Sequence, residues 1–320
     1  MKKKIIIITG DPNSVNSEII YKSWKKLKRN VKSRIYFISN FELLKKQFNK
    51  INIKVNLTKV NSINDIANSE NLKILNVDLN FTNPFKVKIS SASDYVISSL
   101  NLGHKLGLSK NVLGIINCAI NKRLLKREKI GVTEFLAKKC NINDGSEVML
   151  ISNKNFSVSP ITTHIDLKDV SKKINKNIII KKVKTINKWF KNKYKRSPKI
   201  GILGLNPHNA ELRNNSEEKK IIIPAIKRLK KFKIFLKGPL IADTIFIEDF
   251  SKFDVIVGMY HDQVLTPFKA KYKFNAINAT LGIKYPRVSP DHGTAEKLIG
   301  KNKANPKSLI ECINFIDSSR

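Results

Sequence analysis

Three of the five histidines in this 320-residue sequence stand in compact polar settings. They belong to Thr162-Thr163-His164, Asn206-Pro207-His208 and Tyr260-His261-Asp262. Neutral imidazole is the commonest side-chain metal ligand near neutral pH, and three protein ligands with one open position are typical of a catalytic metal site. Because long stretches of chain separate these histidines, they meet only if three strand ends or loops converge, as at the carboxyl edge of an α/β sheet. A single histidine is more often an ordinary residue than a ligand, so this prediction depends on the surrounding sequence.

The elements that would position these histidines alternate between strand-like and helical runs. Such alternation predicts an α/β fold with a mostly parallel sheet, and 320 residues are enough for a large core split into two lobes. Residues 50–90 give no clear assignment. We expect strands over 5–8, 33–39, 111–118, 147–151, 199–204 and 253–259, and helices over 17–27, 42–49, 166–174, 182–194, 217–229 and from 133.

Two features predict a cytoplasmic protein without a membrane span. No window approaches 18 consecutive apolar residues, and the apolar run 5–8 stops at Thr9-Gly10-Asp11-Pro12, too short for a signal peptide. The cysteines are Cys118, Cys140 and Cys312, an odd number with no CxxC pair, which favours a reducing compartment and neither disulfides nor a zinc–thiolate site.

The formal net charge of +36 raises the alternative of a basic nucleic-acid-binding protein. The lysines, however, are spread along the whole chain, and the densest stretch, residues 168–199, alternates with Ile and Val as an amphipathic helix and strand do. A dedicated binder gathers its charge in a stripe with aromatic residues. We therefore favour a solvated cationic surface with no specific nucleic acid and no membrane as partner. Such a surface attracts phosphorylated substrates.

The loop after the first expected strand has no GxGxxG, so a dinucleotide would not bind at a Rossmann turn. Seven other motifs carry more information. In chain order they are Gly10-Asp11-Pro12, Gly131-x-Thr133-Glu134, Thr162-Thr163-His164, Gly204-Leu205-Asn206-Pro207-His208, Gly238-Pro239-x-x-Ala242-Asp243-Thr244, Met259-Tyr260-His261-Asp262-Gln263 and Ser289-Pro290-Asp291-His292-Gly293-Thr294-Ala295. This ordered set resembles the 4-hydroxythreonine-4-phosphate dehydrogenase family of vitamin B6 biosynthesis. The last motif, with Gly300-Lys301 and Asn305-Pro306, also resembles the cofactor loop of isocitrate and isopropylmalate dehydrogenases.

The resemblance implies a two-lobed isocitrate/isopropylmalate dehydrogenase-like fold. Residues 1–320 would form a single catalytic unit of two interleaved α/β lobes, with the active site in the interlobe cleft and shared across a homodimer. It also implies a phosphorylated small-molecule substrate, NAD or NADP, and one divalent metal ion such as Zn, Mg or Co. The matching residues are His164, His208 and His261 for the metal; Thr133, Lys269, Asn278 and Arg287 for the substrate; and His292, Gly293, Ala295 and Asn305 for the cofactor.

The implied reaction oxidises the secondary alcohol of 4-phosphohydroxy-L-threonine to a 3-oxo acid. That acid decarboxylates to 3-amino-2-oxopropyl phosphate. A metal would act as a Lewis acid on the hydroxyl and then stabilise the charge left by decarboxylation. Asp243 or Asp262 would orient a ligating imidazole or accept the hydroxyl proton, and the sequence leaves these roles open. Lys122 is a third candidate catalytic residue.

The sequence departs from the family pattern at three places. Val132 stands where the family has a substrate-contacting His, Asn121 replaces a His before Lys122, and residues 13–17 replace a glycine-rich loop. Loss of a buried partner at Val132 would cost about 1–3 kcal/mol. Two alternatives therefore stay open: a D-threonate or D-erythronate 4-phosphate dehydrogenase, whose substrates lack the amino group, and an inactive relative.

Overall fold

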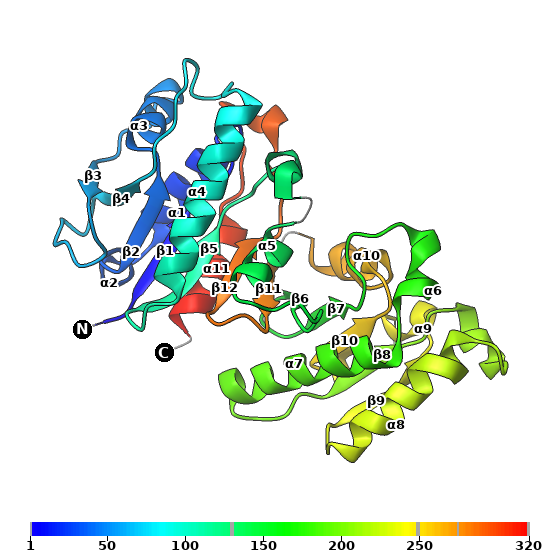
Figure 1. Ribbon diagram of the computed structural model, residues 1–320. Helices are drawn as coiled ribbons and strands as arrows, with labels where there is room; N and C mark the ends of the chain where they lie inside the picture. Colours follow the sequence, from blue (N-terminus) through cyan, green and yellow to red (C-terminus); the bar gives the residue numbers. More distant parts are fainter. Residues whose placement is uncertain (1, 129–130, 248–249, 274, 319–320) are drawn as a thin grey trace. The chain divides into compact units, whose positions relative to one another are not determined.

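The computed structural model describes residues 2–128, 131–247, 250–273 and 275–318. The chain divides into two compact units, shown in Figure 1. The first unit combines Met1–Cys140 with Ile283–Arg320, and the second is Asn141–Gly282. The first unit is therefore built from both ends of the chain, and the second is one continuous insertion.

The sheet of the first unit is parallel throughout its described pairings. The strand order is β3-β4-β2-β1-β5-β12. Strand β1 has four buried isoleucines in succession, as expected of a parallel strand covered on both faces. The strands are β1 (Lys4–Ile8), β2 (Ile35–Ser39), β3 (Leu57–Val60), β4 (Leu72–Asn76), β5 (Val112–Asn117) and β12 (Arg287–Pro290).

Helices α4 and α11 cover opposite faces of this sheet. Ile5 of β1 is paired with Gly114 of β5, and a Cβ on Gly114 would lie 2.7 Å from Cδ1 of Ile316 in α11. Ile8 is an odd number of residues further along, so its side chain points to the other face. There a Cβ on Gly103 of α4 would lie 2.5 Å from Ile8 Cδ1, so glycine allows the close approach. The helices of this unit are α1 (Asn16–Lys26), α2 (Arg29–Lys32), α3 (Phe41–Lys50), α4 (Ile89–Gly107), α5 (Val132–Lys139) and α11 (Lys307–Asp317), with 3₁₀ turns η1 (Lys122–Glu128) and η6 (Glu296–Leu298).

The second unit has a mixed sheet in the order β11-β6-β7-β10-β8-β9. Strand β6 is antiparallel to both neighbours, and β7, β10, β8 and β9 are mutually parallel. The strands are β6 (Val148–Ser152), β7 (Ser157–Pro160), β8 (Ile200–Leu203), β9 (Leu236–Leu240), β10 (Val255–Gly258) and β11 (Ile277–Leu281). The helices are α6 (Val170–Lys173), α7 (Lys176–Tyr194), α8 (Ile223–Lys231), α9 (Ala242–Ile245) and α10 (His261–Tyr272), with 3₁₀ turns η2 (Leu167–Asp169), η3 (Pro207–Leu212) and η5 (Phe250–Lys252) and the π-helical turn η4 (Glu218–Ile222).

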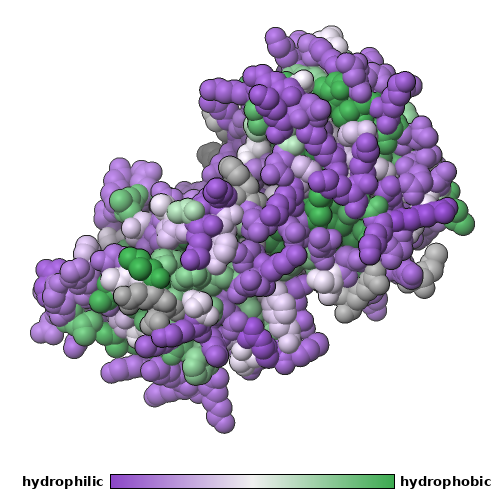
Figure 2. Space-filling view, turned by 180° about the vertical axis from the view of Figure 1, so that it is seen from behind, coloured by the Kyte–Doolittle hydropathy of each residue, from purple (hydrophilic) through white to green (hydrophobic). Residues whose placement is uncertain are grey.

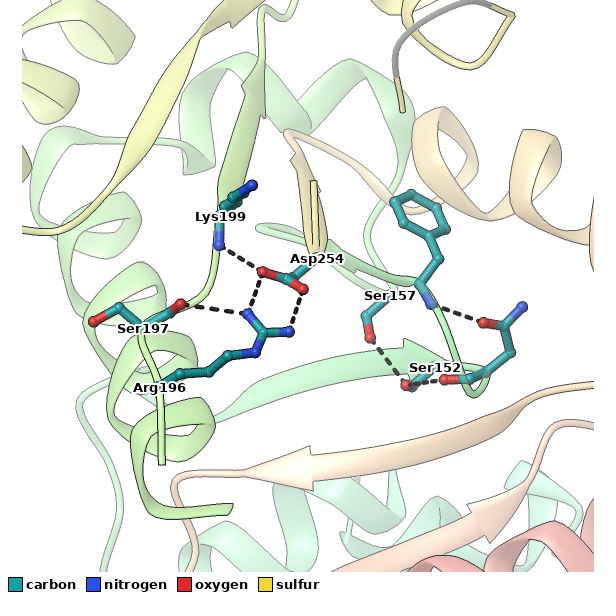
Figure 3. Close-up of polar contacts among 8 residues, drawn as sticks. Ser152, Ser157, Arg196, Ser197, Lys199 and Asp254 are labelled. Carbon is teal, nitrogen blue, oxygen red and sulfur yellow. Dashed lines mark hydrogen bonds and ion pairs between the residues drawn. The ribbon is translucent and has the colours of Figure 1, made fainter. Parts of the chain in front are cut away.

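An ion pair fixes the amino ends of the parallel strands in the second unit (Figure 3). Asp254, directly before β10, accepts hydrogen bonds from Arg196 Nη1 at 2.7 Å and Nη2 at 2.6 Å. The same carboxylate accepts from the Lys199 backbone N–H at 2.7 Å, just before β8. The hydrogen bonds from Arg196 are the main reason that the pKa of Asp254 is lowered. The candidate site lies at the opposite, carboxyl ends of these strands.

Two expected helices differ from the observed elements. The helix expected over 166–174 is a 3₁₀ turn followed by the short α6, because only Val170 and Ile174 of this stretch are buried. The helix expected over 217–229 begins with the π-helical η4, because Pro224 offers no N–H to the preceding turn. The helix expected over 182–194 is α7, which begins six residues earlier, at Lys176. The other expected elements are present within two residues of their predicted bounds. Helices α2, α4, α9, α10 and α11 and strands β7, β9, β11 and β12 were not predicted, and β3 and β4 lie within residues 50–90, which gave no clear assignment.

Hydrophilic residues cover most of the face seen in Figure 2, in both units, with separate apolar areas between them. Cys118, Cys140 and Cys312 are buried free thiols. Among the described residues, no helix is long and apolar enough to cross a membrane.

Candidate active site

The three histidines follow the carboxyl ends of three adjacent strands. His164 comes after β7, His208 after β8 and His261 after β10, and these strands are parallel in the order β7-β10-β8. Because parallel strands present their carboxyl ends at one edge, the three segments lie at the same edge of the sheet. His261 is the first residue of α10.

Hydrogen bonds join the three histidine segments to one another. The backbone N–H and Oγ1 of Thr162 both donate to the carbonyl of Met259, at 3.1 and 2.8 Å. Gln263 accepts from the Met259 N–H at 2.7 Å through Oε1 and donates from Nε2 to the carbonyl of Gly204 at 2.8 Å. Gln263 therefore links the end of β10 to the end of β8.

Glu218 holds the turn that leads to His208. It is fully buried, and its Oε1 accepts the backbone N–H groups of Leu205 and Asn206, each at 2.8 Å. The Asn206 side chain donates to Oε2 at 3.1 Å. Burial raises the pKa of Glu218, but the hydrogen bonds that it accepts, chiefly from Asn206 and also from Leu205, together outweigh this effect, and the pKa lies below its ordinary value. His208 then begins a left-handed turn, with φ of 49°. Such backbone is rare for residues other than glycine and persists only where its surroundings hold it.

The structure brings two of the three predicted metal ligands together. The rings of His164 and His261 have centroids 5.8 Å apart, a spacing at which two imidazoles can share a metal ion. Nδ1 of His261 lies 2.6 Å from Oδ1 of Asp262, which leaves Nε2 for a ligand. His208 instead has Nε2 at 3.8 Å from Oδ2 of Asp243. Within the described part of the chain, no group of three or more His, Cys, Asp or Glu side chains is placed to hold a metal. The donors thus fit a metal in part, and each predicted carboxylate contacts a different histidine.

A cavity of about 840 Å³ in the second unit adjoins both carboxylates. Asp243, Asp262 and Tyr260 contribute polar groups to its wall. Aromatic side chains from β7, α9, η5 and α10 and the segments beside them form much of the rest: Phe156, Phe246, Phe250, Phe268 and Tyr272. The cavity combines apolar walls with a few polar groups, which is typical of small-molecule sites.

Two of the four predicted substrate-binding residues meet in the first unit. Arg287, the first residue of β12, is 3% exposed and donates from Nη1 to Thr133 Oγ1 at 3.3 Å. Its Nε donates to Oδ1 of Asn117 at the end of β5, at 2.7 Å. Burial lowers the pKa of Arg287 to about 10, so the guanidinium stays charged near neutral pH. Lys122 is exposed at the start of η1.

The other two predicted substrate residues lie in the second unit. Lys269 is half-buried on α10, and Asn278 is half-buried on β11. Oδ1 of Asn278 is buried and accepts no hydrogen bond from the described residues. A buried polar atom without a partner is uncommon and is expected where a ligand or water supplies one.

The predicted cofactor residues lie on one irregular segment, 292–305, of the first unit. Ala295 has φ of 48°, and a Cβ on Gly293 would meet open space. His292 has Nδ1 at 2.9 Å from the Gly293 carbonyl, and its Nε2 is buried with no hydrogen-bond partner among the described residues. Asn305 is exposed. The open space beside Gly293 and the unpaired Nε2 of His292 are consistent with a group bound at this segment.

This segment occupies the place where a Rossmann fold binds pyrophosphate. The backbone N–H of Val15, the N-cap residue of α1, donates to the carbonyl of Thr294 at 3.1 Å. The loop after β1 turns at Gly10, where φ is 78° and a Cβ would lie 2.6 Å from the Ala119 carbonyl oxygen. The chain therefore has a physical reason to lack the dinucleotide fingerprint after β1.

The departures from the family pattern have local explanations. Residues 13–17 need no glycine, since none of these described residues has positive φ. Asn13 instead exchanges hydrogen bonds with both backbone groups of Val87, at 2.9 and 2.8 Å. The Asn121 N–H donates to Asp11, whose pKa is raised chiefly by burial. Val132 is the first residue of α5 and is half-buried.

Sequence reasoning did not assign roles to Gln263 or Glu218. Gln263 lies two residues after His261 in the same motif, so the sequence places it near the predicted site without indicating its role. Glu218 is one glutamate in an amphipathic run, and no sequence signal marks it as buried.

Comparisons with known proteins identify the family and the fold of this chain. A family model described as pyridoxal phosphate biosynthetic protein PdxA matches residues 31–316. The 4-hydroxythreonine-4-phosphate dehydrogenase of Sulfurihydrogenibium sp. is 37% identical over 320 residues, covering 98% of this chain and 97% of the relative. A protein of Oceanobacillus iheyensis with the provisional name D-threonate 4-phosphate dehydrogenase is 31% identical, covering 98% of this chain and 97% of the relative.

Solved structures agree with this assignment at the level of the fold. The 4-hydroxythreonine-4-phosphate dehydrogenase of Klebsiella pneumoniae superposes with a TM-score of 0.85 at 24% identity, covering all of both chains. Isocitrate dehydrogenase of Methylococcus capsulatus gives a TM-score of 0.50 at 13% identity, covering 100% of this chain and 88% of that one. The fold is thus that of the isocitrate dehydrogenase-like class. Within it, the chain belongs to the PdxA family of pyridoxal phosphate biosynthesis. The resemblance, the fold class and the prediction of a dehydrogenase are confirmed.

Proposed function

We propose that this chain oxidises 4-phosphohydroxy-L-threonine with NAD or NADP and a divalent metal ion. The product is a 3-oxo acid that loses CO₂ to give 3-amino-2-oxopropyl phosphate, in the biosynthesis of pyridoxine 5′-phosphate. The observation that carries this proposal is the set of three histidine segments at one sheet edge, with the His164 and His261 rings 5.8 Å apart. The names of the full-length relatives support the substrate.

The polar residues of the second unit would hold the metal ion and accept the proton of the substrate's secondary alcohol. His164, His208 and His261 would hold the metal ion, and Asp262 would orient the His261 ring through its 2.6 Å contact. When bound, a divalent metal lowers the pKa of the substrate hydroxyl and stabilises the negative charge that remains on the substrate when CO₂ departs. Asp243 or Asp262 would accept the hydroxyl proton. Lys122 would serve as a further catalytic group of the first unit.

The remaining predicted residues would bind the substrate and the dinucleotide. Arg287, Thr133, Lys269 and Asn278 are the residues that we propose to bind the phosphorylated substrate. His292, Gly293, Ala295 and Asn305 would contact the dinucleotide, which accepts the hydride when bound. Two electrons and a hydrogen nucleus leave the alcohol carbon as hydride, and the hydroxyl proton leaves to the carboxylate.

We also propose that a homodimer completes the metal site. His208 contacts Asp243 rather than the other two rings, so one described chain does not gather all three ligands. If His208 and His261 of one site come from different copies, a mixed dimer of His208→Ala and His261→Ala chains contains one intact site. Random mixing of these inactive variants would then restore roughly a quarter of the wild-type activity, since half of the dimers are mixed. No restoration would contradict a shared site.

A second candidate is a D-threonate or D-erythronate 4-phosphate dehydrogenase. It is favoured by the Oceanobacillus iheyensis relative and by Val132, which offers no polar group to a substrate. The chemistry is the same, because these substrates also carry a secondary alcohol beside a carboxylate-bearing centre.

The test is NADH or NADPH formation by the purified, metal-loaded protein. We expect 4-phosphohydroxy-L-threonine to be oxidised, with activity lost to a chelator and in His261→Ala but retained in His104→Ala, a histidine of the first unit outside the predicted site. Oxidation of only the sugar-acid phosphates would favour the second candidate. Oxidation of none of them, with metal bound, would indicate an inactive relative.

A further inference from the structure

Glu18, which is buried, and Lys22, which is half-buried, form an ion pair on helix α1 that no motif includes. Glu18 is 3% exposed, and its Oε1 lies 2.7 Å from Nζ of Lys22, one turn further along the helix. A buried carboxylate is costly unless it is paired and hydrogen-bonded. The partners of this pair therefore indicate what it serves.

Both side chains bind the backbone of the segment that carries Asn305. Glu18 Oε1 accepts the Ala304 N–H at 2.8 Å. Lys22 Nζ donates to the carbonyls of Asn302 at 2.9 Å and Ala304 at 3.1 Å. One carboxylate and one ammonium thus match an N–H and two carbonyls of a single short stretch.

This stretch needs outside support because it is an exposed, irregular loop. Glycine and asparagine are the residue types that best accept its positive φ angles. Gly300 has φ of 75° and Asn302 has φ of 53°, and residues 300–303 are exposed. Ordering such a loop costs conformational entropy, so a loop held in place before binding gives a higher affinity. The 292–305 segment is also held near its start by the bond from Val15 to Thr294.

We propose that Glu18 and Lys22 are positioning residues that hold residues 302–305 in the conformation that binds the dinucleotide. This inference rests on the proposed function, because it takes 292–305 as the cofactor segment. It adds to that function two residues that contact neither the substrate nor the predicted metal ligands. A purely structural brace would stabilise the first unit without affecting cofactor affinity.

The test compares Glu18→Ala, Lys22→Met and the conservative Glu18→Gln with Asp317→Asn. Asp317 forms an ion pair with buried Arg34, in the same unit and between other elements, so its loss is a matched control. Fluorescence titration gives the Kd of NADH and NADPH for each folded variant, thermal unfolding gives Tm, and kinetics give KM for both substrates.

We expect Glu18→Ala and Lys22→Met to weaken dinucleotide binding by roughly tenfold or more, because each leaves a buried group without its partner. KM for the dinucleotide should rise, while KM for the phosphorylated substrate should change little. Glu18→Gln keeps an oxygen for the Ala304 N–H and should recover much of the affinity. Asp317→Asn should lower Tm and leave Kd unchanged.

The contrary result would be Glu18→Ala and Lys22→Met with a lower Tm but a dinucleotide Kd within about twofold of wild type. That would make the pair a structural brace and overturn the inference. These measurements distinguish failure of the proposed function from failure of the proposed role of the ion pair. A wild-type protein that binds neither NADH nor NADPH contradicts the proposed function itself. Binding that is lost in Asn305→Ala but kept in Glu18→Ala contradicts only the role of the ion pair.

Discussion

Replacement of Glu218 tests how the turn before His208 is held. The carboxylate is fully buried and accepts the backbone N–H groups of Leu205 and Asn206, each at 2.8 Å, and the Asn206 amide at 3.1 Å. Alanine would leave two half-buried backbone donors without an acceptor, at about 1 kcal/mol each. With the cavity left by the side chain, we expect Glu218→Ala to lower the free energy of unfolding by about 3–5 kcal/mol.

Glu218→Gln separates positioning from simple stability. Its amide oxygen can still accept the two backbone N–H groups, so only the charge and the bond to the Asn206 amide are lost, at about 1–2 kcal/mol. Without the bond to the Asn206 side chain, two residues before His208, the turn is held less firmly, so divalent-metal binding should weaken by about tenfold, the scale measured for groups that support metal ligands. Urea unfolding and competition with a chromophoric chelator measure the two effects.

The neighbouring Glu217 is the matched control. It is half-buried and makes one bond of 2.9 Å to the Asn206 amide, so Glu217→Ala should change both quantities little. Glu218→Ala with a free energy of unfolding within about 0.5 kcal/mol of wild type would refute the assigned hydrogen bonds. Reduced stability with unchanged metal affinity in Glu218→Gln would refute the positioning of His208.

Three further predictions concern the site and the scaffold. Asp262→Asn should weaken metal binding by about tenfold or more, because His261 loses its charged partner; equal affinity in the chelator competition would contradict this. Arg287→Lys should raise KM for the phosphorylated substrate by roughly tenfold, since lysine lacks the bidentate fork, and an unchanged KM would exclude Arg287 from the phosphate site. Asp254→Asn should cost about 1 kcal/mol of unfolding free energy at pH 7 through loss of the Arg196 pair, with kcat unchanged. Because the folded pKa of Asp254 lies below its ordinary 3.8, the difference should be complete above that value and disappear as the pH falls through the folded pKa; a constant difference in acid would be inconsistent.

The sequence predicts the buried strands and the sheet edge well for a physical reason. Strands covered on both faces need continuous apolar β-branched runs, as in β1 and β10, and such runs are visible without a structure. Strand β12 was missed because it begins with Arg287 and ends with Pro290, and α4 because its five serines dilute the apolar pattern. Tertiary packing, rather than a local sequence pattern, determines where β12 and α4 form.

For the candidate site as well, the sequence indicates some residues and not others. His208 and His261 could be placed at strand ends because each follows a predicted strand, whereas β7, the strand before His164, was not predicted. Glu218 and Gln263 could not be assigned, because their roles consist of hydrogen bonds to backbone groups that only the folded chain brings near. The role of the Glu18–Lys22 ion pair could not be predicted either, since its backbone partners lie 280 to 286 residues away in the sequence.

The stoichiometry of CO₂ and reduced dinucleotide from 4-phosphohydroxy-L-threonine tests the proposed reaction most directly. The metal-loaded protein would be incubated with this substrate and NAD or NADP, and both products measured in the same samples. The proposed oxidation followed by decarboxylation predicts one CO₂ for each NADH or NADPH, and neither product after chelation. CO₂ without reduced dinucleotide, or neither product from the metal-loaded protein, would contradict it.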